Sequence, residues 1–138
     1  MDQVKVPWVY RLALVAVCVQ TAAAVGFLGQ APGAFSYPES ALLGLPMLAS
    51  LPFNIGMIIV LSRAVRSRAI SRWVVAAACA IFAGWHVYGL GSLLHWWQSD
   101  YRLAYFIASD RIASVVYQAT MSAVFATALV VILRPARA

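Results

Sequence analysis

The chain has 138 residues, which is enough for one domain, but its composition is not that of a soluble domain. Only 10% of the residues are charged, against about 25% in a typical soluble domain, and 64% are apolar. The formal net charge of +6 at pH 7 raises the question of a nucleic-acid partner. Because the basic residues lie between long apolar segments, we expect contact with a lipid bilayer and no nucleic acid.

Four apolar runs follow one another along the chain, and none of them contains Lys, Arg, Asp or Glu. They cover residues 12–29, 41–61, 73–94 and 112–133, with 18, 21, 22 and 22 residues. A helix needs about 20 mostly apolar residues to cross a hydrocarbon core of about 30 Å. The runs therefore predict an all-α integral membrane protein, with four transmembrane helices in a single domain over residues 1–138.

The positive charges alternate between the two sides of these predicted spans. Eight of the ten basic residues precede the first run, separate the second from the third, or follow the fourth: Lys5, Arg11, Arg63, Arg66, Arg68, Arg72, Arg134 and Arg137. Positively charged loops stay in the cytoplasm, so we place both termini in the cytoplasm and the four spans in the inner membrane. The first run resembles a secretory signal. We expect it to remain as a span, because the charges require an even number of spans.

Short connections predict the arrangement of the helices. Loops of about ten residues join the first three runs, which forces neighbouring helices to run antiparallel in an up-down-up-down bundle. Four arginines, Arg63, Arg66, Arg68 and Arg72, cluster in the second connection. We expect this cluster to fix the orientation of the chain. The alternative is that it binds anionic lipid head groups or an acidic partner.

One polar side chain interrupts each predicted span: Gln20, Asn54, His86 and Gln118. At about 1.5 Å per residue, all four lie in the outer half of the membrane or near its midplane. One interpretation is an interhelical hydrogen-bond network that fixes the register of the bundle. The other is a small polar binding pocket that opens outward, in which His86 changes charge near neutral pH.

The second span contains the helix-breaking residues Pro46 and Pro52. Proline removes a backbone donor and crowds the preceding turn, so we expect a kink, or hinge, near Pro52. Small residues spaced along one helical face predict packing seams in the other spans. These are Cys18, Ala22 and Gly26 in the first span, Ala76, Ala80, Gly84 and Gly91 in the third, and Ala119, Ala123 and Thr127 in the fourth.

The two cysteines do not suggest thiol chemistry. Cys18 and Cys79 lie in separate spans and form no CxxC motif, so both are interpreted as small packing residues.

The two histidines could indicate haem, because membrane cytochromes of the b type use histidine ligands. His86 and His95 are nine residues apart, so they project from opposite faces of a helix, about 13 Å apart in height. They cannot bind one iron together. Haem would need His86 from two subunits, or Met47 or Met57 as the second ligand. We predict no metal and no cofactor, with b-type haem as the alternative.

A second group of polar residues lies near the outer boundary of the membrane: Glu39, His95, Asp100 and Tyr101. Such residues could form a metal or acid/base site, but nothing in the sequence fixes their distances. The sequence contains no HExxH, GxSxG or phosphate-binding glycine motif, so we do not expect an enzyme.

Three functions remain open. The first is an accessory, assembly or protective subunit that acts through contacts with another membrane protein, a lipid or a second copy of itself. The second is an oligomeric transporter or channel for a small solute or protons, which would use the polar layer. The third is a membrane redox subunit linked to haem or quinone.

Overall fold

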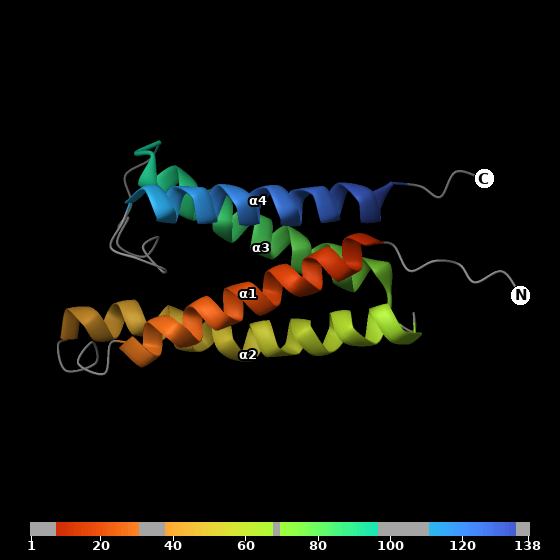
Figure 1. Ribbon diagram of the computed structural model, residues 1–138, viewed down its shortest axis with the longest axis horizontal. Coiled ribbons are helices and arrows are strands. Elements are labelled where there is room, and N and C mark those ends of the chain that lie inside the picture. The colour runs from red at the N-terminus through yellow and green to blue at the C-terminus, as the bar shows by residue number, and fades with distance from the viewer. Residues whose placement is uncertain (1–7, 31–37, 68–69, 97–110, 135–138) are drawn as a thin grey trace, which may run out of the picture.

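The structure is a computed structural model that describes residues 8–30, 38–67, 70–96 and 111–134. It describes side chains over residues 8–26, 50–66, 70–96 and 112–134. The described residues form four helices: α1 (Trp8–Gln30), α2 (Pro38–Ser67), α3 (Arg72–Leu93) and α4 (Arg111–Leu133). The prediction of an all-α chain is confirmed. Figure 1 shows the helices side by side, with the start of α1 and the end of α4 at the same end of the bundle.

Three of the helices are long and apolar enough to cross a membrane. The candidate spans among the described residues are Trp8–Gly26, Arg72–Leu93 and Ile112–Leu133. They indicate a multi-pass membrane protein. The remaining predicted span, residues 41–61, falls within α2, whose side chains are described only from Ser50 onward.

The proline residues do not end α2. The helix begins at Pro38, where proline is favoured because the first helical residues have no intrahelical acceptor for their N–H groups. It then continues through Pro46 and Pro52 to Ser67. The kink or hinge expected at these two positions stays a prediction.

Local hydrogen bonds define both ends of α3. The Ser71 side chain accepts a hydrogen bond from the backbone N–H of Trp73, at 3.3 Å, and so caps the start. At the other end, His95 adopts a left-handed conformation with φ of 57°. The backbone N–H groups of His95 and Trp96 then donate to the carbonyls of Ser92 and Gly91, at 3.3 and 2.9 Å. This pattern is a Schellman motif, with histidine where glycine is usual.

The helices pack as two pairs. α3 packs most closely against α4, and α1 against α2, whereas α2 and α3 barely meet. In the half of the bundle where α1 starts and α4 ends, the buried side chains form one apolar core. Its fully buried members include Val9, Ala13, Val17, Leu61, Val75, Cys79, Phe125 and Ala128. Because α2 and α3 separate, this core does not close the bundle on that side.

The predicted small-residue seams mostly face outward. Cys18, Ala22 and Gly26 are all exposed, as are Ala119, Ala123 and Thr127 of α4. In the α3 set, Ala76 and Gly91 are buried, whereas Ala80 and Gly84 are exposed. The prediction that these faces pack inside the bundle is therefore wrong for α1 and α4, and it holds only in part for α3. Spacing along a helix shows which residues share a face, but it does not show which way that face turns. Cys79 is buried in the core as expected, whereas Cys18 is not.

Candidate functional site

The four polar side chains of the spans form one continuous chain of hydrogen bonds across all four helices. Gln20 Nε2 donates to Asn54 Oδ1 at 2.9 Å, and Gln20 Oε1 lies 2.8 Å from His86 Nε2. On the other side of the imidazole, His86 Nδ1 lies 2.7 Å from Gln118 Oε1. Asn54 and Gln118 have no exposed surface, and His86 is 1% exposed. Residues that are up to 98 positions apart in the sequence thus share one layer.

The position of His86 in the middle of this chain limits how its protons can be placed. A neutral imidazole has one N–H donor and one acceptor, whereas the cation has two donors. The cation would donate to both glutamine oxygens, but burying that charge without a counter-charge is unfavourable. The neutral ring fits if Nε2–H donates to Gln20 Oε1 and the Gln118 amide turns its NH2 group toward Nδ1. In both states Gln20 still donates to Asn54.

Gly89 makes room for the end of this chain. A Cβ atom at this position would lie 3.0 Å from both the amide carbon and Nε2 of Gln118, and 3.1 Å from Oε1. Any larger residue would therefore push against the amide that contacts His86. At Gly84, by contrast, an added Cβ would meet nothing within 4 Å.

Aromatic rings contact the polar chain at His86. The His86 ring stacks on Phe125 with centroids 5.8 Å apart, and Tyr117 meets it edge-on at 5.6 Å. Phe82 stacks on Phe125 at 4.9 Å and contacts Phe53 at 5.2 Å, so the cluster extends from α4 through α3 to α2. The sequence analysis missed this cluster, because the spacing of aromatic residues alone does not show which rings meet.

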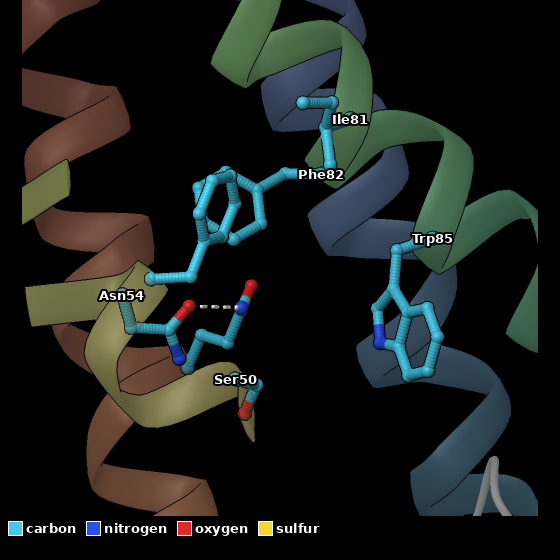
Figure 2. A pocket seen from close by; sticks show the side chains of 7 residues that line it. Ser50, Asn54, Ile81, Phe82 and Trp85 are labelled. Atoms are coloured by element: carbon cyan, nitrogen blue, oxygen red, sulfur yellow. Dashed lines mark hydrogen bonds between the residues drawn. The ribbon is translucent and has the colours of Figure 1, made fainter. Parts of the chain in front are cut away.

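A pocket of about 360 Å³ lies where α2 and α3 separate. Figure 2 shows Ser50 and Asn54 of α2 on one side, and Ile81, Phe82 and Trp85 of α3 on the other. The complete described lining is Gln20, Ser50, Phe53, Asn54, Ile81, Phe82 and Trp85. The pocket is mostly apolar, and it meets the polar chain at Gln20 and Asn54.

Asn54 has one group that the polar chain does not use. Its Oδ1 atom accepts from Gln20, but its Nδ2 atom is buried and has no hydrogen-bond partner among the described residues. An amide NH2 group carries two donors, and a buried donor without a partner is unfavourable. Of the predicted polar layer, Asn54 is thus the residue with spare binding capacity at the pocket.

The other predicted site residues whose side chains the structure describes do not line this pocket. His95 is exposed at the end of α3, whereas Asp100, Tyr101 and the Glu39 side chain lie outside what the structure describes. Arg63, Arg66 and Arg72 are exposed near the α2–α3 connection, and Arg68 falls in the undescribed part. The guanidinium of Arg72 lies over the Trp73 ring, 5.0 Å from its centroid, a cation–π contact.

The histidine geometry bears on the haem alternative. Both ring nitrogens of His86 lie within hydrogen-bond distance of an amide oxygen, so iron would have to displace one of them. Met57 is packed in the apolar core, and the Met47 side chain is outside the described set. Within the described residues, no three His, Cys, Asp or Glu side chains group in a way that would hold a metal ion.

The fold and the site therefore define a small multi-pass membrane protein with a buried polar chain and a pocket on its side. No protein-family model, curated protein or solved structure matches this chain.

Proposed function

We propose that the chain is a four-span inner-membrane protein, with both termini in the cytoplasm, that acts as an accessory subunit through contacts inside the membrane. α2 supplies the fourth span. Exposed arginines support this orientation, because Arg11 lies near the start of α1, Arg63 and Arg66 near the end of α2, and Arg134 just after α4. These helix ends lie at one end of the bundle in Figure 1. Clustering of positive charge at one end is typical of the cytoplasmic side.

The pocket between α2 and α3 is the observation that carries the functional part of the proposal. Ile81 and Trp85, which line it, are 57% and 40% exposed, so the pocket borders the surface that faces lipid. A molecule dissolved in the membrane could enter there sideways without crossing water. We therefore propose that the protein works by holding a lipid-phase molecule in this pocket.

The buried polar chain favours this function over a path for a solute or protons through one bundle. A path would require the polar side chains to meet water, whereas Asn54, His86 and Gln118 are closed off from the surface. Their hydrogen bonds link all four helices, which suits a rigid base beneath the pocket.

Photo-crosslinking in native membranes tests the proposal. A photoreactive amino acid is placed at Ile81, inside the pocket, and in a second variant at Ile59 of α2, which is 50% exposed but does not line the pocket. We expect position 81 to capture one lipid-phase molecule far above its share of the membrane lipid, and position 59 to capture only bulk lipid. The same bulk-lipid mixture at both positions would overturn the proposal.

A further inference from the structure

We infer that the pocket between α2 and α3 binds the ring carbonyl of a neutral, quinone-type molecule from the lipid phase, with Asn54 Nδ2 as the hydrogen-bond donor. This inference rests on the proposed function, because it names the class of molecule that the pocket holds. It concerns binding alone and involves no electron transfer.

The unpaired donor of Asn54 indicates that the ligand carries an acceptor. Asn54 has no exposed surface, lines the pocket, and holds its Oδ1 atom against Gln20. Its Nδ2 atom has no partner among the described residues. Nδ2 is closed off from the pocket, so the lining side chains must shift slightly before a carbonyl oxygen can accept a hydrogen bond from it. The bond from Gln20 to Asn54 Oδ1 then stays in place. The polar chain fixes the orientation of the donor before the ligand arrives.

The lining indicates a neutral ligand with a flat ring. None of the seven described lining residues is charged, so an anionic or cationic head group would be buried without a counter-charge, which is unfavourable. Three of the seven, Phe53, Phe82 and Trp85, are aromatic and offer faces and edges to a ring. A volume of about 360 Å³ is near the lower end for ligand pockets, which suits a head group whose tail stays in lipid.

The depth of Asn54 separates a quinone ring from the ester carbonyl of a glycerolipid. Asn54 is 16 residues from the start of α2 and 13 from its end, about 24 and 20 Å along the helix. It is therefore near the middle of the membrane. Ester carbonyls lie at the edges of the hydrocarbon core, about 15 Å from its centre. A ring carbonyl on a molecule without a polar head group can reach the middle, whereas a head-group ester cannot.

Ligand-induced thermal stabilisation of the purified full chain tests this inference. The probes are a 1,4-benzoquinone with a decyl tail, decylbenzene, which lacks the carbonyls, and a short-chain diacylglycerol, which supplies ester carbonyls. At about one hundred times its Kd, we expect the quinone to raise Tm by about 9 °C. We expect decylbenzene and the diacylglycerol to bind at least tenfold more weakly, because neither places a carbonyl at Asn54.

Three variants locate the effect. Asn54→Leu removes the donor, and we expect it to weaken quinone binding about tenfold. Ile81→Trp fills the pocket and leaves Asn54 and Gln20 untouched, so it should abolish the Tm shift even if Asn54→Leu fails to fold. Ile59→Trp adds the same ring outside the pocket and should bind like the wild type.

Three results would each overturn the inference. The first two are decylbenzene binding as tightly as the quinone, and the quinone shifting the Tm of Ile81→Trp as much as that of the wild type. A diacylglycerol that binds more tightly than the quinone would also overturn it. In each case, specific capture at position 81 in native membranes would leave the proposed function standing. The failure of the two ideas is therefore distinguishable.

Discussion

Gly89 of α3 lies directly against the amide of Gln118 on α4, and a Cβ atom on Gly89 would approach that amide carbon to 3.0 Å. Glycine is the smallest residue, and any larger residue at position 89 would require the Gln118 amide to shift. The hydrogen bond between Gln118 and His86 therefore depends on the absence of a side chain at position 89.

Replacing Gly89 with alanine should displace the Gln118 amide and lower stability. We expect a loss of about 1–3 kcal/mol in the free energy of unfolding, the usual cost of overpacking a closely packed contact. Reversible unfolding in mixed micelles measures it. Gly84→Ala, five residues earlier on α3, is the matched control, because its Cβ would meet nothing within 4 Å. An equal loss for both variants would show that Gly89 is not specially placed.

The contact between His86 and Gln118 should appear as an energetic coupling. Either His86→Leu or Gln118→Leu leaves the other side chain without its partner at 2.7 Å. In double-mutant cycles, hydrogen bonds between membrane helices contribute on average about 0.6 and at most about 1.7 kcal/mol. A double-mutant cycle of unfolding free energies should give a coupling in that range. Strict additivity of the two single changes would contradict the hydrogen bond.

His95 should tolerate glycine and reject a β-branched residue. Its φ of 57° is a left-handed conformation that costs an L-residue about 1–2 kcal/mol and glycine almost nothing. We expect His95→Gly to keep or raise the unfolding free energy, and His95→Val to lower it by about 1 kcal/mol. Thermal unfolding of the two variants side by side measures the difference. A valine variant as stable as the glycine variant would rule out the left-handed end of α3.

The two cysteines should differ sharply in reactivity. Cys18 is exposed on α1, whereas Cys79 is fully buried in the apolar core. An apolar maleimide should label Cys18 of the folded protein in micelles and leave Cys79 unmodified until the protein unfolds. Mass spectrometry of Cys18→Ser and Cys79→Ser measures each thiol separately. Rapid labelling of Cys79 under native conditions would contradict its burial in the apolar core.

The sequence was sufficient to predict that the polar residues share a level along the bundle, but not to predict which way each helix face turns. Because every helical residue rises by about 1.5 Å, counting from the ends of the runs placed Gln20, His86 and Gln118 at similar depths. The structure joins them by hydrogen bonds. The face occupied by Cys18, Ala22 and Gly26 was assigned inward and lies outward, because an apolar helix in lipid has little amphipathic pattern to indicate its inner side.

The pocket could not be predicted, because it depends on how two helices diverge. Asn54 and Phe82 are 28 residues apart, and only the loose meeting of α2 and α3 leaves space between them. The unpaired Nδ2 atom of Asn54 likewise follows from the partner that Gln20 gives to Oδ1. Such properties belong to the packed bundle, and no single span contains them.

Native mass spectrometry of the protein released gently from its own membranes tests most directly whether the α2–α3 pocket holds a lipid-phase molecule. The wild-type protein and Ile59→Trp should both retain one neutral adduct of defined mass. Ile81→Trp, in which the pocket is filled, should be free of it. An adduct of the same mass and abundance on Ile81→Trp would contradict the account, and so would a wild-type protein that carries no adduct.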